Sequence, residues 1–443
     1  AAEERVRKPQ ISVDMFDRLP TPYGLVRAGV APDHAATKGV ESTFAATSAK
    51  RNFRYFLNVE VGKHISHDEL TARYNAVIYA VGAPTDKRLG IPGEGLSGSV
   101  SATEFVAWYN GHPDFADLTF DLSGERAVVV GNGNVALDVA RILVTDPDDL
   151  AKTDIADHAL AALRESNIRE VVLLARRGIA QAAYTNSEFL ALGEVDGVDV
   201  IIDPAELTLD PVSEAAQSDD ELDSTIATKL RLAQEFAARP TTEGNKRIVF
   251  RFMTSPTELT GDGKVEALHA VCNVYTEAGE NVAIVPTDDG FDLETGLVLR
   301  AIGYRGVPIN DVPFDEVRCV VPNVEGRVQS SVDGEIVRGL YVTGWIKRGA
   351  TGGIGRNRLC GQETAESVIA DFVAGVLPQS STSADDVADL VADHGAHRID
   401  LAGWKNIDAT ERSAGKSAGR RRVKLVHIGD LESASREAAE SRS

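Results

Sequence analysis

Cysteine is scarce in this chain and never forms a redox pair. The 443 residues include three cysteines, Cys272, Cys319 and Cys360, which are far apart and form no Cys-x-x-Cys motif. The sequence therefore disfavours a disulfide framework, a dithiol redox centre and an all-cysteine iron–sulfur cluster. We interpret the three thiols as small hydrophobic side chains.

Long apolar runs and an excess of basic residues are also lacking. No segment approaches the roughly 18 apolar residues of a membrane span, and the first residues lack the apolar stretch of a signal peptide. Lys and Arg number 46 against 67 Asp and Glu, which gives a formal net charge of −21 and argues against nucleic-acid binding. We expect a cytoplasmic protein with no nucleic-acid partner and no membrane span.

Short apolar strands alternate with helical segments in much of the chain. Residues 126–130 predict a strand, a helix with an apolar face follows from Val135 to Leu143, and residues 171–175 predict the next strand. This alternation indicates a parallel, doubly wound sheet. The length and the 43% of hydrophobic residues suit about two or three domains.

Other stretches complete the expected elements. Buried strands are predicted at 11–17, 76–82, 297–304 and 339–345. Antiparallel strands are predicted at 247–253 and through 272–275, as a small β insertion in the second domain.

Two predictions concern the C-terminal third. A helix after Thr351 is expected to turn Val368, Ile369, Phe372 and Val373 inward. The basic run Arg420–Lys424 is interpreted as a solvated face, with docking or binding of a cofactor phosphate as the alternative.

The motif Gly131-Asn132-Gly133-Asn134-Val135-Ala136 has the form G-x-G-x-x-A, follows a strand and opens a helix. Gly131 permits the tight turn, Gly133 lets a pyrophosphate approach the backbone, and the small Ala136 lets the helix pack closely on the strand. The helix start offers free N–H groups to phosphates. The motif predicts dinucleotide binding, with a plain strand-to-helix turn as the alternative.

The next strand ends in Arg176-Arg177, where an NAD site would usually supply an acid. Two guanidiniums can hold a 2′-phosphate through forked, charge-assisted hydrogen bonds. NADP is therefore favoured over NAD, and a solvated basic turn is the alternative.

A second dinucleotide site is indicated by Asp17, which ends the strand at 11–17 where a ribose-binding acid would stand. The strand ends at Gly82, Gly303 and Gly344 are candidates for close approach of backbone to a flavin. Together these features predict an α/β flavoprotein with two Rossmann-like dinucleotide-binding domains.

Three long motifs resemble those of adrenodoxin-reductase-type ferredoxin–NADP⁺ reductases. They are Leu19–His34, Gly344–Gly355 and Gly131–Arg141, and the similarity extends to the tail around Trp404 and Arg420–Lys424. The resemblance implies a glutathione-reductase-like arrangement of three-layer parallel sheets. It places an FAD domain at residues 1–100 and 308–443 and an NADP domain at residues 101–307.

The resemblance also implies the chemistry: hydride passes from NADPH to FAD, and single electrons then pass to a ferredoxin-type iron–sulfur protein. Carried over position by position, the implied cofactor contacts are Asp17 at the FAD ribose; Leu25 and Val61 at the flavin and adenine regions; Trp345, Gly352, Gly353 and Ile354 at the isoalloxazine; and Asn134, Val135, Arg176, Arg177 and Glu188 at NADP.

His34 and Glu188 are the implied candidates for proton handling near the flavin. His34 as an ordinary histidine near a helix cap is the alternative, as is a Glu188 that only hydrogen-bonds the cofactor. We expect a monomer or weak dimer.

The chain departs from the family pattern at its start, where the first strand, Gly-rich turn and helix of the FAD domain are not found. Ala1–Val6 resembles the last turns of that helix, and roughly 20 residues are missing by the usual spacing. We expect the natural protein to begin further upstream and this chain to bind FAD weakly or not at all.

Other functions remain open at this stage. One is a reductase subunit of a larger NADPH-dependent complex, such as the glutamate-synthase small subunit. Another is a non-catalytic NADP-binding protein, and a disulfide reductase is disfavoured because a Cys-x-x-Cys motif is absent.

Overall fold

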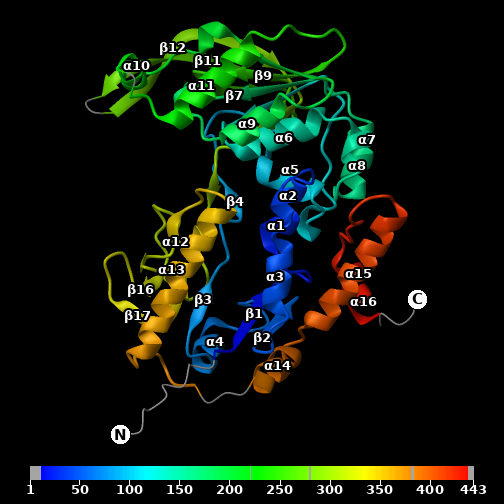
Figure 1. Cartoon of the computed structure of the whole chain (residues 1–443), viewed down its shortest axis with the longest axis vertical. Coiled ribbons are helices and arrows are strands. Elements are labelled where there is room, and N and C mark those ends of the chain that lie inside the picture. Colours follow the sequence, from blue (N-terminus) through cyan, green and yellow to red (C-terminus); the bar gives the residue numbers. More distant parts are fainter. Residues whose placement is uncertain (1–10, 220, 279–280, 381–383, 438–443) are drawn as a thin grey trace. The chain divides into compact units, whose positions relative to one another are not determined.

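The computed structural model describes residues 11–219, 221–278, 281–380 and 384–437, which leaves the expected helical remnant at Ala1–Val6 outside the described residues. The chain divides into two compact units (Figure 1). Unit 1 comprises residues 1–30, 34–83 and 306–443, and unit 2 comprises residues 31–33 and 84–305. The units therefore change at 83/84 and 305/306, whereas the sequence prediction put the boundaries at 100/101 and 307/308.

Unit 2 is built on a six-stranded parallel sheet with the strand order β5-β13-β6-β7-β9-β8. Its sheet strands are β5 (Ser99–Ser101), β6 (Arg126–Val130), β7 (Glu170–Leu174), β8 (Val198–Ile202), β9 (Lys246–Arg251) and β13 (Leu297–Arg300). The helices are α5 (Ala102–Tyr109), α6 (Asn134–Val144), α7 (Pro147–Leu150), α8 (Asp157–Arg164), α9 (Asn186–Leu192), α10 (Pro211–Ser218) and α11 (Ser224–Ala237).

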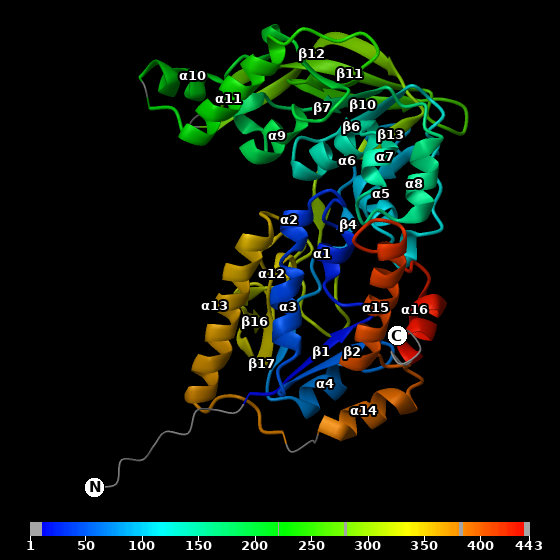
Figure 2. The ribbon, with the colours of Figure 1, turned by 45° about the vertical axis from the view of Figure 1, so that its right-hand side comes forward.

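A separate antiparallel sheet covers one face of this parallel sheet. It consists of β10 (Thr254–Thr260), β11 (Ala267–Ala278) and β12 (Asn281–Glu294). Val128 and Val130 of β6 belong to one core cluster with Leu259 and Leu268 of the antiparallel sheet. Side chains alternate between the faces of a strand, so the intervening residues point toward the helical layer that includes α6, α9 and α11 (Figure 2). Unit 2 thus has three layers, as predicted.

The prediction of an antiparallel strand at 247–253 was wrong. This segment forms β9, which pairs in parallel with both β7 and β8. An apolar run does not reveal strand direction, and here helix α11 returns the chain for a parallel crossover. The prediction through 272–275 is confirmed, because these residues lie in the antiparallel β11.

Unit 1 contains a two-stranded and a four-stranded sheet. The strands are β1 (Val13–Asp17), β2 (Phe53–Leu57), β3 (Val77–Tyr79), β15 (Asn323–Val324), β16 (Arg327–Gln329) and β17 (Ile336–Val342). The parallel pairs are β1 with β2 and β3 with β17. Among the described residues no strand joins these two pairs, and Val13 and Met15 of β1 are exposed.

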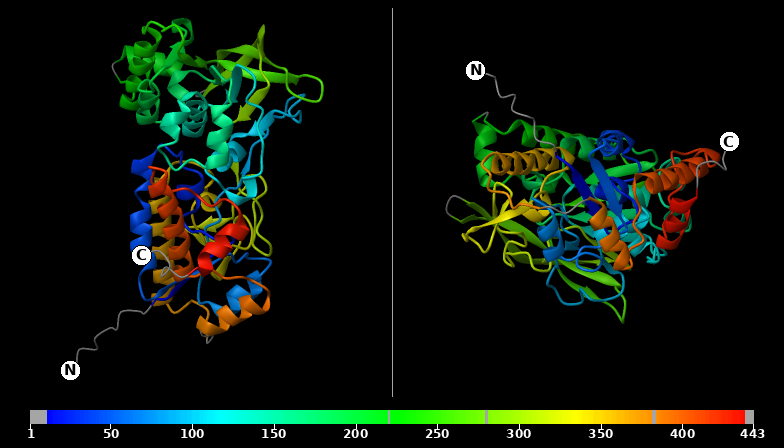
Figure 3. Two further views of the ribbon diagram at one scale, coloured as in Figure 1. Left: turned by 90° about the vertical axis from the view of Figure 1, so that its right-hand side faces the viewer. Right: turned by 90° about the horizontal axis from the view of Figure 1, so that it is seen from below.

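The helices of unit 1 include a C-terminal group that packs on β2. The helices are α1 (Gly24–Ala28), α2 (Ala35–Lys38), α3 (Glu41–Ser48), α4 (His67–Arg73), α12 (Trp345–Arg348), α13 (Ile354–Val373), α14 (Ala384–Asp393), α15 (Leu401–Ser417) and α16 (Ile428–Arg436). Helices α15 and α16 lie side by side (Figure 3). Trp404, Ile407 and Leu431 pack with Tyr55 and Leu57 of β2 in one core cluster. None of the described helices is both long enough and apolar enough to cross a membrane.

Helix α13 turns a different face inward from the one predicted. Of the four predicted residues, Val368 is half-buried and Ile369, Phe372 and Val373 are exposed. Thr364 and Ser367 are buried instead. The buried hydroxyls are satisfied because Thr364 donates to the carbonyl of Val342 and Ser367 to that of Glu325. Small polar residues can occupy the buried face of a helix when they hydrogen-bond to the neighbouring backbone. The positions of large apolar residues therefore do not identify the buried face of α13.

The prediction that Arg420–Lys424 is a solvated face was wrong for part of the run. Arg422 and Lys424 are buried. Glu411 of α15 accepts hydrogen bonds from Arg422 at 2.7 Å and from both terminal nitrogens of Arg27 at 2.8 and 2.5 Å. Burial raises the pKa of Glu411, but Arg27 and Arg422 lower it, and the net pKa lies below the usual range. This cluster joins α1 to the C-terminal tail.

Glu411→Gln should lower the free energy of unfolding by about 3 kcal/mol, because it removes the carboxylate that pairs with the buried Arg27 and one of the carboxylates that pair with the buried Arg422. The control is Glu235→Gln, which removes an exposed pair with Arg231 and should change stability by about 0.5 kcal/mol or less. Since the pKa of Glu411 is depressed on folding, its contribution is present above pH 4.5 and is lost as the pH falls through the folded-state pKa. Urea unfolding at several pH values tests this, and equal stability of the two variants at neutral pH contradicts it.

Candidate functional site

The turn between β6 and α6 requires glycine at its first position. Gly131 has a φ of +146°, and a Cβ there would lie 2.3 Å from the carbonyl oxygen of Ala301. Its amide donates to the carbonyl of Leu174 at the end of β7. The turn is therefore held against both neighbouring strands, β13 and β7.

The start of helix α6 leaves open space in front of the turn. Gly133 is the N-cap residue, and a Cβ added to it would meet only the Cβ of Ala183, at 4.0 Å. Ala136 is fully buried against the sheet. Helical hydrogen bonding begins with the amide of Ala136, which donates to Gly133, so the preceding amides are directed to a ligand or solvent. This geometry fits a bound pyrophosphate.

A second segment lies against the turn. The amide of Ala183 donates to the carbonyl of Asn132, and the amide of Thr185 donates to the side chain of Asn134, both at 2.8 Å. Val135 is half-buried beside them. We call residues 182–185 the bracing segment.

Arg176 and Arg177 follow β7 and are both exposed. Neither forms an ion pair within the described part of the chain. Strand β11 supports their backbone, because Asn273 donates to the carbonyl of Arg176 at 2.9 Å and the Tyr275 hydroxyl accepts from the amide of Gly178 at 3.0 Å. Sequence reasoning missed these two supports, which lie almost 100 residues along the chain.

Glu188 lies in the first turn of α9, where its amide donates to the side chain of Thr185. Its carboxylate is 3.8 Å from Arg141 of α6. Arg141 is buried and also binds Asp33 at 2.6 Å and Asp138 at 2.8 Å. Arg141 stood inside a recognised motif, but its role in holding three carboxylates could not be read from the sequence.

Asp17 ends β1 in unit 1, where its side chain accepts the amide of Leu19 at 2.9 Å. Burial raises the pKa of Asp17 to about 6. Hydrogen-bond donors on a ligand would offset that cost of burial, which makes this carboxylate a suitable acceptor for ribose hydroxyls.

The other predicted FAD contacts also lie in unit 1. Leu25 is an exposed residue of α1, and Val61 is half-buried between two core clusters. Trp345 begins α12.

Gly352 and Gly353 precede α13, which begins at Ile354 and has 20 residues. A Cβ added at Gly353 would meet nothing within 4 Å, whereas at Gly352, with a φ of +73°, it would meet Arg356 at 2.6 Å. Gly353 thus leaves room at the start of a long helix, as a flavin site requires.

His34 belongs to unit 1 and is the N-cap residue of the short helix α2. Its side chain forms no capping hydrogen bond, so helix capping does not explain this histidine. Of the three glycines predicted near a flavin, Gly82 and Gly344 lie in unit 1 and Gly303 lies in unit 2.

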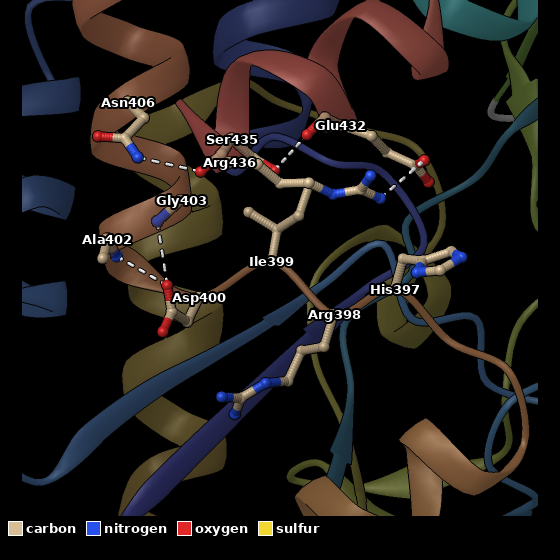
Figure 4. Close-up of a pocket in the computed structure, with 10 residues that line it drawn as sticks. All are labelled: His397, Arg398, Ile399, Asp400, Ala402, Gly403, Asn406, Glu432, Ser435 and Arg436. Carbon is tan, nitrogen blue, oxygen red and sulfur yellow. Dashed lines mark hydrogen bonds and ion pairs between the residues drawn. The ribbon is translucent and has the colours of Figure 1, made fainter. Parts of the chain in front are cut away.

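A pocket of about 320 Å³ near the C-terminal helices contains none of the predicted site residues (Figure 4). Its polar groups bind one another: Asp400 accepts the amides of Ala402 and Gly403, and Asn406 donates to the carbonyl of Ser435. We assign no ligand to it.

The fold sorts the predicted residues into two sets. All the predicted FAD contacts lie in unit 1, and all the predicted NADP contacts lie in unit 2.

No protein-family model matches the chain, but several characterised proteins are similar to it. It is 46% identical to NADPH-ferredoxin reductase FprA of Mycobacterium leprae over 424 residues, covering 95% of this chain and 91% of the relative. It is 41% identical to the mitochondrial NADPH:adrenodoxin oxidoreductase of Arabidopsis thaliana over 434 residues, covering 95% and 89%. The solved structure of Mycobacterium tuberculosis FprA in complex with NADPH matches with a TM-score of 0.89 and 46% identity, over 96% of this chain and 92% of that one.

The fold, with one candidate dinucleotide site in each unit, is that of an oxidoreductase with two dinucleotide-binding domains. Relatives more than 40% identical match nearly the whole chain. The chain belongs to the adrenodoxin-reductase-type ferredoxin–NADP reductase family.

Two substitutions in the Gly-rich turn should have separable effects. Gly131→Ala should lower the free energy of unfolding by about 3 kcal/mol, because the new methyl group meets backbone at a positive φ. Gly133→Ala should change stability by about 0.5 kcal/mol or less but weaken NADP⁺ binding, since its methyl group enters the open space. Thermal unfolding and NADP⁺ titration test this, and unchanged NADP⁺ affinity in Gly133→Ala would falsify the placement of the pyrophosphate.

Asp17→Asn should stabilise the protein without FAD at pH 7.5 by about 1 to 2 kcal/mol. The raised pKa of Asp17 means that its protonated form stabilises the fold below pH 3.8 and that this contribution is lost as the pH rises through about 6. The advantage of the variant should therefore shrink between pH 6 and pH 4. Asp14→Asn, which breaks the ion pair with Arg54 on the same strand, is the control and should not be stabilising at pH 7.5.

Proposed function

We propose that this protein is an NADPH-dependent, FAD-containing ferredoxin reductase, which takes a hydride from NADPH and delivers single electrons to a ferredoxin-type iron–sulfur protein. The observation that carries the proposal is the pair Arg176 and Arg177. Both are exposed and follow the strand beside the Gly-rich turn, in a chain about 46% identical to NADPH-ferredoxin reductases. FAD, when bound, supplies the exchange between two-electron and one-electron chemistry.

Unit 2 is the proposed NADP domain. Arg176 and Arg177 would hold the 2′-phosphate through forked hydrogen bonds. The turn Gly131–Ala136 would hold the pyrophosphate at the start of α6, with Asn134 and Val135 in contact. The bracing segment keeps the Asn134 side chain in place through Thr185.

Unit 1 is the proposed FAD domain. Asp17 would accept the ribose hydroxyls, and Leu25 and Val61 would line the flavin and adenine regions. Trp345, Gly352 and Gly353 would contact the isoalloxazine, and the backbone amide of Ile354 at the start of α13 would stabilise negative charge on it.

His34 and Glu188 are the proposed proton-handling residues. Arg141 lies 3.8 Å from Glu188 and can hold its carboxylate in position, either for proton transfer or for a hydrogen bond to the cofactor amide.

A ferredoxin-type partner is proposed from the names of the relatives. One is an NADPH-ferredoxin reductase, and another is an NADPH:adrenodoxin oxidoreductase. A monomer or weak dimer in the cytoplasm stays a prediction. The alternatives, a subunit of a larger complex or a non-catalytic NADP-binding protein, are not favoured by these relatives.

Replacing Arg176 and Arg177 with Gln should weaken NADPH binding about a hundredfold, because two charge-assisted contacts to the 2′-phosphate are lost. NADH binding should change little, so the preference for the phosphorylated coenzyme should fall by the same factor. The measurement is kcat/KM for both coenzymes with added FAD and a ferredoxin acceptor.

The control for this pair is Arg164→Gln, an exposed arginine of unit 2 that pairs with Asp148 away from the turn. It should leave the coenzyme preference intact. An undiminished preference in the double variant would mean that the 2′-phosphate is bound elsewhere.

A further inference from the structure

Lys229 occupies an unusual position in helix α11 of unit 2. It lies on the buried face of the helix with Leu230, Ala233 and Phe236, and it is 4% exposed. A lysine on such a face is uncommon unless it is paired with an acid. No carboxylate lies within ion-pair distance of Lys229 in the described part of the chain.

The ammonium group of Lys229 contacts the bracing segment. It donates a hydrogen bond of 2.5 Å to the carbonyl of Ala182 and lies 5.0 Å from the ring centre of Tyr184. The Tyr184 hydroxyl is itself buried and has no hydrogen-bond partner among the residues that the structure describes. The charge is therefore held by one carbonyl and one aromatic face, neither of which neutralises it.

The bracing segment connects this charge to the dinucleotide turn. Ala183, the residue after the carbonyl that Lys229 binds, donates its amide to Asn132 inside the turn. Its Cβ is also the nearest atom to the open space at Gly133. Lys229 is thus connected to the turn that would hold the pyrophosphate by two hydrogen bonds, through the backbone of Ala182 and Ala183.

The positive charge of Lys229 favours a bound anion at the turn that the bracing segment contacts. Desolvation lowers the pKa of Lys229. The negative charge of Asp223, which caps the start of α11, acts in the opposite direction but does not cancel this lowering. A positive charge in a low-dielectric interior acts over a longer distance than one in water, so a bound diphosphate would compensate it.

We propose that Lys229 is a positioning residue of the dinucleotide site, whose buried positive charge strengthens binding of the cofactor's pyrophosphate and whose hydrogen bond holds the bracing segment. This inference rests on the proposed placement of the cofactor at Gly131–Ala136. Because the pyrophosphate is common to both coenzymes, Lys229 should serve NADP and NAD equally, unlike Arg176 and Arg177.

Three variants separate the charge from the hydrogen bond: Lys229→Met removes both, Lys229→Gln keeps a donor, and Lys229→Arg keeps the charge. The measurement is the affinity of the full chain for NADP⁺ and for NAD⁺. We expect the Met and Gln variants to bind both coenzymes about tenfold more weakly, by a similar factor for each, and the Arg variant to bind nearly as the wild type. Lys152→Met, an exposed lysine of the same unit, is the control and should have no effect.

Several outcomes would overturn the inference. Normal coenzyme binding by Lys229→Gln would mean that only the hydrogen bond matters. Normal binding by Lys229→Met would mean that Lys229 has no role in coenzyme binding. A loss of affinity confined to NADP⁺ would mean that the charge acts on the 2′-phosphate. If Lys229→Met fails to fold in a thermal melt, the comparison of the Gln and Arg variants decides. If Gly133→Ala and the double arginine variant also bind the coenzymes normally, the proposed placement of the cofactor is wrong. If those two variants bind more weakly and the Lys229 variants do not, only the role of Lys229 is wrong.

Discussion

The pairing of β6 and β7 in parallel register is the constraint on which the candidate NADP site depends. Val130 pairs with Leu174 at the ends of the two strands, so the Gly-rich turn and the arginine pair emerge at the same edge of the sheet. The amide of Gly131 closes this edge by donating to Leu174. The space between a helix start and two guanidiniums is then suited to a dinucleotide with an extra phosphate.

Buried charged side chains hold the structure together at positions that no local sequence pattern marks. Glu411 joins Arg27 and Arg422 in unit 1, and Arg141 joins Asp33, Asp138 and Glu188 in unit 2. Lys229 has no carboxylate within ion-pair distance among the described residues and donates to the carbonyl of Ala182. A buried charge is costly unless it is compensated. The first two clusters are compensated by ion pairs within the protein, and for Lys229 the proposed compensation is a bound pyrophosphate.

Much of the fold was predictable because strands and helices leave strong local signals. The strands at 126–130 and 171–175, the helix from Asn134 and the antiparallel sheet follow from patterns that span a few residues. The direction of β9 was predicted wrongly, because it depends on the crossover through α11. The inner face of α13 was also predicted wrongly, because Thr364 and Ser367 are buried against backbone carbonyls that only the folded chain brings near.

The sequence by itself determined which residue types stand at each strand end, and therefore the class of cofactor and the family. Its glycines and paired arginines act through backbone geometry and charge that belong to a few consecutive positions. Only the tertiary structure decided that Asn273 and Tyr275 support the arginine turn, that part of the basic run 420–424 is buried, and that Lys229 hydrogen-bonds to the bracing segment. These contacts join residues that are 11 to 397 positions apart, and no local pattern records which distant partner a buried charge will meet.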